Sequence, residues 1–351
     1  MGYPVRADSS AKRVIIMTRA HEAALAALPR AMNLIAIVCA LALEQWRSFE
    51  WRSATERAYV QYARGIERRL NGGTLAQGAI ATALAVVPPV AAAAAISSLL
   101  GAVHPLLAFA FDVLVLYALM GFRRFSHAIS AIIGALNAGD VQGARRALAQ
   151  WGGTSGGELS TQEIARVAIE RGLADAYRQV FAVLFWFVVL PGPAGAVLYR
   201  AAALLAAQWR GAVPGDDLTV LARSLATFGL PARRLLWLLD WIPARLTALS
   251  FAVVGDFEDA AYCWRTQART WPAAQGGEAV GVVLASGAGA LGVQLGGPLG
   301  GDDAQREPRP EIGIGEPVEA EVLPSAVGLV WRALVLWLLL VLLLSLANWA
   351  P

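Results

Sequence analysis

The residues whose placement first requires a chemical explanation are charged side chains inside long apolar runs. Asp112 lies in the middle of the run 105–121, and Asp240 and Arg245 lie in the run 235–254. An ionisable side chain at the centre of a membrane span costs roughly 2.5–3.5 kcal/mol, so it usually faces a cavity or a partner. For Asp240 and Arg245 two interpretations stay open: a structural ion pair inside a helical bundle, or a polar site at the membrane boundary.

Other residue types that support catalysis are scarce. Cys39 and Cys263 lie far apart and form neither a disulfide framework nor a CxxC motif, and the three histidines are scattered (His21, His104 and His127). The sequence contains no GxSxG, HExxH or GxxxxGK[ST] motif, and its single lysine is Lys12. We therefore expect no metal site and no known hydrolytic or transfer signature.

Composition indicates which elements must position these residues. Of the 351 residues, 57% are hydrophobic and only 16% are charged, whereas soluble domains carry about 25% charged residues. The net charge of +3 is small, so the chain lacks the cationic surface of a nucleic-acid-binding protein. A cytosolic enzyme, a disordered regulator and a nucleic-acid partner are all excluded.

Six apolar runs are candidates for membrane spans, which need about 20 mostly apolar residues. They are 31–43, 78–100, 105–121, 180–198, 235–254 and 326–346. The first is short, and the fifth contains charged residues. The pattern predicts an all-α fold, a polytopic transmembrane helical bundle of about five or six spans.

Arginines flanking these runs predict the orientation. They cluster in the segments 47–71 and 123–179, and positively charged flanks stay in the cytoplasm. Both segments and the later segment 255–324 are therefore predicted to be cytoplasmic. The lipid bilayer is the expected partner.

The chain divides into an N-terminal extension and one membrane domain. Residues 1–31 show no signal-peptide pattern, and Met32, at the start of the first span, is interpreted as the native start. The alternative is a real amphipathic arm. The membrane domain then covers 32–351.

Two polar segments interrupt the membrane domain. The insert 123–179 is predicted to be helical, with Asp140 as an N-cap and with Ser160 and Glu163 as a capping box. The Gly/Pro-rich segment 276–324 is predicted to be a flexible cytoplasmic loop.

Five blocks, in order, resemble the CobD/CbiB superfamily of bacterial inner-membrane proteins, which also includes the AmpE branch. The blocks are Ala135–Asp140 with Ala144–Leu148, Arg166–Glu170, Leu184–Trp186 with Gly195–Arg200, Asp240–Leu246 and Gly289–Gly297. The resemblance implies a membrane protein that joins an aminopropanol-type amine, or its phosphate, to the carboxylate of adenosylcobyric acid. That reaction uses ATP and magnesium.

Several polar positions of the family pattern differ in this chain. Glu170 is retained, but the serine position is Arg171, and the later Glu-Asn pair is at best Asp175. The family's Asn-Thr-Leu-Asp-Ser-Met run becomes the largely apolar segment 203–208, and its Ser-Pro-Asn-Ala-Gly run is replaced by 276–282. Losing several ligands together is a large change for metal-dependent catalysis.

Two functional hypotheses follow from the resemblance. Segments 184–187 and 254–257 look more like the AmpE branch, which implies a catalytically degenerate accessory or sensory protein of the cell envelope, with no cofactor and no catalytic residues. The alternative is an adenosylcobinamide-phosphate synthase-like enzyme of cobalamin biosynthesis, with ATP and magnesium.

The surviving polar residues form the candidate site. They are Glu170, Asp175, Tyr199, Arg200, Asp240 and Arg245. We expect them to line a pocket at the cytoplasmic membrane boundary, where the two arginines suit an anionic ligand. The alternative is that they only tie the bundle together. An unidentified anionic ligand or an envelope protein is the expected partner, and no metal ligand is predicted.

Overall fold

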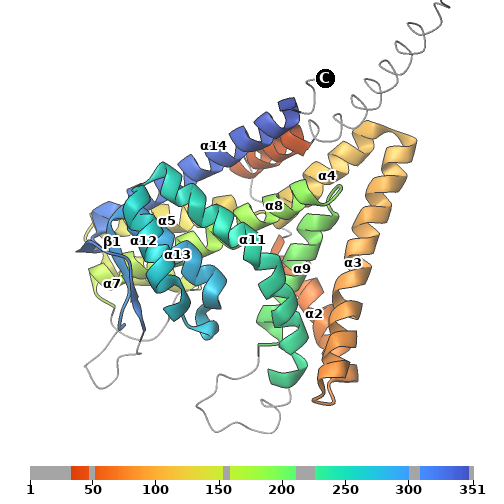
Figure 1. The fold of residues 1–351 in the computed structure, drawn as a ribbon, viewed down its shortest axis with the longest axis horizontal. Helices are drawn as coiled ribbons and strands as arrows, with labels where there is room; N and C mark the ends of the chain where they lie inside the picture. The colour runs from red at the N-terminus through yellow and green to blue at the C-terminus, as the bar shows by residue number, and fades with distance from the viewer. Residues whose placement is uncertain (1–32, 47–51, 153–158, 211–225, 300–308, 348–351) are drawn as a thin grey trace, which may run out of the picture.

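Runs of alanine and leucine, which favour helices, build most of this fold (Figure 1). The computed structural model describes residues 33–46, 52–152, 159–210, 226–299 and 309–347. The predicted extension 1–31 and Met32 lie outside these residues. The helix Asn33–Trp46 comes first. It is followed by α2 (Arg52–Leu70), α3 (Leu75–Val103), α4 (Pro105–Leu119), α5 (Phe122–Asn137), α6 (Val141–Gln150), α7 (Thr161–Ala176), the π-helical turn η1 (Tyr177–Phe181), α8 (Ala182–Val189), α9 (Ala194–Gln208), α11 (Leu230–Val254), α12 (Phe257–Gln267), α13 (Gly277–Leu291) and α14 (Leu323–Ala347). The predicted all-α bundle is confirmed.

Four helices in the described part of the chain are long and apolar enough to cross a membrane: Leu75–Val103, Thr161–Val189, Ala226–Val254 and Ala320–Ala347. At 1.5 Å per residue, a helix of 29 residues is about 43 Å long and exceeds a hydrocarbon core of about 30 Å. The predicted runs 31–43 and 105–121 form shorter helices, which fall below the length needed to span.

The fourth predicted span, 180–198, was wrong in its bounds. The helix begins at Thr161, continues through η1 and ends at Val189. The segment Pro191–Pro193 interrupts it, because proline lacks the N–H that a continuing helix needs, and α9 then begins at Ala194. The last helix of the predicted insert 123–179 is therefore continuous with a candidate span.

The predicted helix caps are confirmed. The Asp140 carboxylate accepts the Gly143 N–H at 2.7 Å and begins α6. At the start of α7 the Glu163 N–H donates to Ser160 Oγ at 3.2 Å, and the Ser160 N–H donates to the Glu163 carboxylate at 2.7 Å. These short-range bonds satisfy backbone N–H groups that have no intrahelical acceptor.

The predicted flexible loop over 276–324 was also wrong. Its first part is the buried helix α13, and β1 (Val293–Gly296) follows directly. The strand β1 lies between β2 (Glu311–Ile312), to which it is antiparallel, and β3 (Glu316–Pro317), to which it is parallel. Glycine serves close packing in α13: a Cβ at Gly289 would collide with the carbonyl oxygen of Asp259 on α12.

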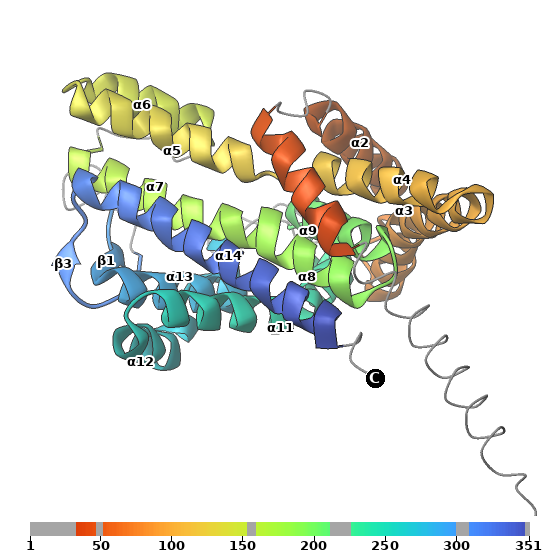
Figure 2. The same cartoon turned by 90° about the horizontal axis from the view of Figure 1, so that it is seen from above.

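The helix formed by α7 and α8 runs through the middle of the molecule. Viewed from above, α5 and α6 lie on one side of α7, α12 and α13 lie on the other, and α14 crosses it (Figure 2). The main hydrophobic core surrounds α7, η1 and α8. This arrangement places the polar side chains of α7 between α6, α13 and the small sheet.

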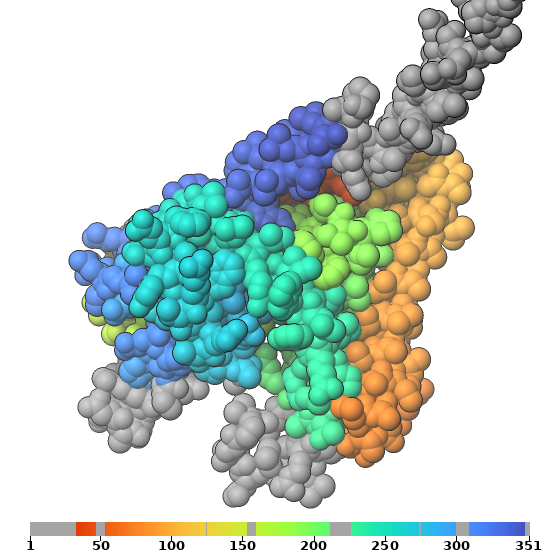
Figure 3. Space-filling view, in the orientation of Figure 1, coloured from red at the N-terminus to blue at the C-terminus, as the bar shows by residue number. Residues whose placement is uncertain are grey.

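Outward-facing apolar side chains cover α3 and α14, which lie on the outside of the molecule (Figure 3). On α3 they include Leu84, Val87 and Leu99, and on α14 they include Leu339 and Leu343. Exposed apolar surface of this extent marks a membrane or partner interface. With the long apolar helices, it identifies the chain as a membrane protein.

Candidate functional site

A cavity of about 350 Å³ lies beside α7 and is lined by five charged residues. Its lining residues come from four separate stretches of the chain. They are Gly152, Val167, Glu170, Arg171, Ala174, Asp175, Arg178, Trp271, Gln275, Val280, Leu284, Leu299 and Arg309. Three arginines and two carboxylates therefore surround a space of ligand size, because small-molecule pockets occupy about 300–1,000 Å³.

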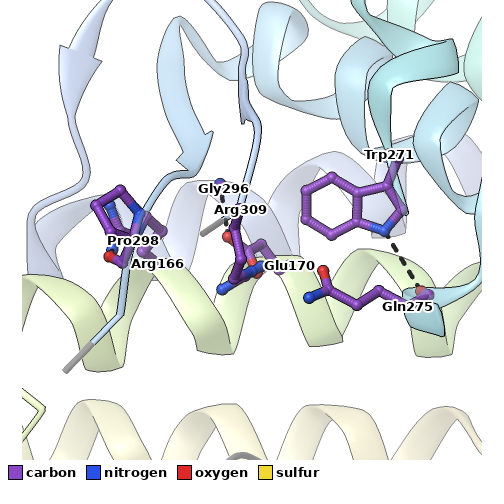
Figure 4. A network of polar contacts seen from close by, with 7 residues as sticks. All are labelled: Arg166, Glu170, Trp271, Gln275, Gly296, Pro298 and Arg309. Carbon is purple, nitrogen blue, oxygen red and sulfur yellow. Dashed lines mark hydrogen bonds and ion pairs between the residues drawn. The ribbon is translucent and has the colours of Figure 1, made fainter. Parts of the chain in front are cut away.

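Glu170 joins α7 to the small sheet (Figure 4). Its Oε1 accepts the Gly296 N–H at 2.7 Å, and its Oε2 pairs with the Arg309 guanidinium. The Glu170 and Arg309 side chains are 8% and 5% exposed. Arg309 also lies over the Trp271 ring, with its guanidinium carbon 5.3 Å from the ring centroid. Both oxygens of Glu170 are thus occupied by hydrogen bonds from the protein.

Asp175 lies one turn further along α7 and is anchored from two sides. Its Oδ2 accepts the Trp151 indole N–H at 3.0 Å and lies 3.7 Å from Arg171 Nε. Arg171 in turn donates to the Gly152 carbonyl oxygen. These contacts hold the C-terminal end of α6 against α7 and keep the Arg171 guanidinium at the cavity wall.

Asp240 forms a buried cluster with two tyrosines. The hydroxyl of Tyr177 in η1 donates to Asp240 Oδ1 at 2.5 Å, and that of Tyr199 in α9 donates to the same oxygen at 2.8 Å. All three residues are buried. Arg178, next to Tyr177, interacts electrostatically with this carboxylate. One carboxylate therefore links η1, α9 and α11.

The remaining two predicted site residues form separate ion pairs. Arg200 pairs with Glu56 of α2 at 2.6 Å, and Arg245 pairs with Glu278 of α13 at 3.1 Å. The Asp240–Arg245 pair, one of the two interpretations of these charges, is therefore not formed. Of the six candidates, only Glu170 and Asp175 line the cavity.

Sequence reasoning missed four polar residues of the cavity wall: Arg178, Trp271, Gln275 and Arg309. In Figure 4, Trp271 and Gln275 face the Glu170–Arg309 pair. Each of Arg178, Gln275 and Arg309 has a buried side-chain atom without a hydrogen-bond partner. Buried polar atoms are almost always paired, so such a concentration indicates a ligand-binding surface.

The donor set does not fit a protein-held magnesium ion, which prefers free carboxylate oxygens. Both Glu170 oxygens and Asp175 Oδ2 are already bonded to protein donors. No group of three or more His, Cys, Asp or Glu residues that could hold a metal ion occurs in the described ranges.

The comparison with known protein families identifies the relatives of this chain. The sequence model of the CobD/CbiB protein family matches residues 37–330. The chain belongs to the CobD/CbiB family. Its buried Glu170 and its Asp240 lie in two of the five blocks that carry the resemblance, Arg166–Glu170 and Asp240–Leu246.

Individual relatives of this CobD/CbiB chain carry consistent names. It is 33% identical over 314 residues to the cobalamin biosynthesis protein CobD of Stutzerimonas stutzeri (strain A1501), a match covering 88% of this chain and 96% of the relative. It is 38% identical over 261 residues to the protein of the same name from Chromobacterium violaceum, covering 74% and 77%. No solved structure matches the chain. These names favour the cobalamin alternative over the AmpE-like, catalytically degenerate hypothesis, which they do not support.

Proposed function

We propose that this chain is a multi-pass inner-membrane enzyme of cobalamin biosynthesis. In the proposed reaction it joins an aminopropanol-type amine, or its phosphate, to the carboxylate of adenosylcobyric acid at the expense of ATP. The observation that carries this proposal is the match, over most of both chains, to a relative named cobalamin biosynthesis protein CobD. The charged cavity beside α7 supplies a site with suitable chemistry.

Amide formation requires activation of a carboxylate by a phosphate compound. The amine nitrogen forms a bond to the acyl carbon, the activated oxygen leaves with its phosphate, and the amine loses a proton. The protein must therefore bind polyanionic phosphate groups and hold an amine nearby. Preorganised cations that meet developing phosphate charge supply much of the catalysis in such sites.

The cavity beside α7 contains groups for both tasks. Arg171, Arg178 and Arg309 present guanidinium groups, which match phosphate geometry with several N–H donors. The Asp175 carboxylate, held by Trp151, provides a negative group for an ammonium substrate. Glu170 positions Arg309 and does not contact substrate in this proposal, because both of its oxygens are engaged.

The differences from the family pattern change which residues would neutralise the phosphate charge, and they leave the proposed reaction the same. Where the family has a serine after the retained glutamate, this chain has Arg171, and the guanidinium of Arg171 lies in the cavity wall. A cation has replaced a neutral group at that position. We therefore propose that arginines neutralise the phosphate charge here.

Growth complementation tests this function. A strain lacking its own adenosylcobinamide-phosphate synthase is supplied with the gene for this chain and with cobyric acid under conditions that require cobalamin. We expect growth, and we expect Arg171→Ala to reduce it while the exposed control Arg265→Gln does not. Cobinamide supplementation shows that the later steps of the strain are intact. If the chain accumulates in the membrane and cobyric acid still fails to support growth, the proposed function is wrong.

A further inference from the structure

We propose that the cavity beside α7 is a metal-independent binding site for a phosphate group, with Arg178 as its principal contact. The inference rests on the same cavity as the proposed function. It makes a separate claim, namely that a phosphate binds directly to guanidinium groups without a divalent cation. The phosphate is carried either by a nucleotide or by a small phosphorylated amine.

Arg178 differs from the other two arginines of the cavity wall, because within the described residues its interactions are electrostatic only. It forms no hydrogen bond or ion pair with any residue in the described part of the chain, and its Nε is buried without a partner. Arg171 and Arg309, in contrast, pair with Asp175 and Glu170. A partly buried charge without a partner is costly, so an anion bound next to Arg178 would remove this cost.

The neighbouring carboxylate of Asp240 attracts Arg178 but forms no ion pair with it in the described part of the chain. Its Oδ1 is taken by the hydroxyls of Tyr177 and Tyr199. The π-helical turn places the two adjacent residues differently: Tyr177 is buried against Asp240, and Arg178 lines the cavity. Single π turns of this kind are often found at functional sites.

The other residues of the cavity wall indicate which further chemical groups the ligand carries. Three arginines against two carboxylates give the wall a net charge of +1, counting the charged residues that line the cavity. The Gln275 side-chain oxygen is buried without a donor, so it suits an amine or hydroxyl of the ligand. A cavity of about 350 Å³ lies at the small end of ligand sites and therefore suits a phosphate-bearing small group.

Binding to the purified full-length chain in detergent tests this inference. Isothermal titration calorimetry is performed with inorganic phosphate, ATP and O-phosphoethanolamine, each with EDTA and each with Mg²⁺. We expect at least one phosphate probe to bind in EDTA. We expect Arg178→Gln to weaken that binding roughly 10- to 100-fold, the size of a lost charge-assisted hydrogen bond. Arg178→Lys, which keeps the charge, should lose less.

An exposed arginine provides the control for this experiment, and three results would contradict the inference. Arg265→Gln removes the same charge from an exposed side chain of α12 and should bind as the wild type does. The inference is overturned if every probe requires Mg²⁺, if none binds, or if Arg178→Gln binds as tightly as the wild type. The stronger of the ATP and O-phosphoethanolamine arms identifies the source of the phosphate. Binding without complementation by cobyric acid would overturn the proposed function alone.

Discussion

Removing one partner of the Glu170–Arg309 ion pair should destabilise the whole α7 region. Both side chains are less than a tenth exposed, and breaking a buried pair by removing one partner costs about 3–5 kcal/mol. For Arg309→Met we expect about 3 kcal/mol, the lower end of that range, because the Gly296 N–H still donates to Glu170. For Glu170→Gln the expected cost is similar, because the buried guanidinium loses its counter-charge and, among the described residues, keeps its contact with the Trp271 ring.

The double variant tests whether these costs arise from the pair itself. In Glu170→Gln/Arg309→Met the amide oxygen still accepts from Gly296 and no charge is left buried. We expect it to be more stable than the sum of the single variants predicts by at least about 2 kcal/mol, a coupling typical of residues in contact.

Unfolding by SDS titration in mixed micelles, followed by tryptophan fluorescence, measures these differences. The chain has 12 tryptophans, and Trp271 reports directly on the pair. Arg265→Met, which alters an exposed arginine, should stay within about 0.5 kcal/mol of the wild type. Single variants as stable as the wild type, or costs that simply add, would refute the reasoning.

Four further predictions concern other parts of the molecule. Asp240→Ala removes the side-chain acceptor of two buried tyrosine hydroxyls, of which Tyr177 still has the backbone carbonyl of residue 240 at 3.3 Å. It should cost about 1–3 kcal/mol in the same titration; Asp240→Asn should cost less, and equal costs would contradict this account. Gly296→Ala places a Cβ against backbone at φ +77° and should destabilise the chain by more than Gly292→Ala, where the added Cβ has open space. Burial raises the pKa of the Cys263 thiol to about 11. At pH 8, iodoacetamide should therefore alkylate it roughly 100-fold more slowly than a cysteine of ordinary pKa, with the rate rising up to pH 11; a rate equal to that of the SDS-unfolded chain would contradict the prediction. Reporter fusions next to Gly139 should report a cytoplasmic location, and a periplasmic signal would overturn the predicted orientation.

Local signals in the sequence predicted local structure well. The caps at Asp140 and at Ser160–Glu163 depend on residues three positions apart, so their geometry is independent of the remaining fold. The spans 78–100, 235–254 and 326–346 were found because about 20 apolar residues in succession have few other uses. These features needed no knowledge of distant contacts.

Two features of the sequence, its glycine content and its charge, led to wrong predictions of local structure. In 276–324 the glycines indicated a loop, but in α13 they allow close approach of α12. The charged first half of Thr161–Val189 concealed its continuity with the apolar second half. In both cases the deciding factor is the neighbouring helix, which the sequence pattern does not show.

The site was predictable only in part for the same reason. Glu170 and Asp175 followed from the family resemblance, and both line the cavity. Arg309 lies 139 residues after Glu170, in the segment that had been interpreted as a loop. Arg178 depends on a π-helical turn for which the sequence gives no signal. Contacts between distant segments, and irregular turns, come from the packed fold alone.

The residues of the cavity wall lie far apart in the sequence, so the ribosome adds them at different times during synthesis. The ribosome releases Glu170 early, but its counter-charge, Arg309, follows only after 139 further residues. At about 5–20 residues per second, this interval lasts roughly 7 to 28 s. Throughout it the Glu170 carboxylate lacks the guanidinium with which it pairs in the folded chain. Chains released prematurely, before Arg309 and the last helix, therefore lack a finished cavity.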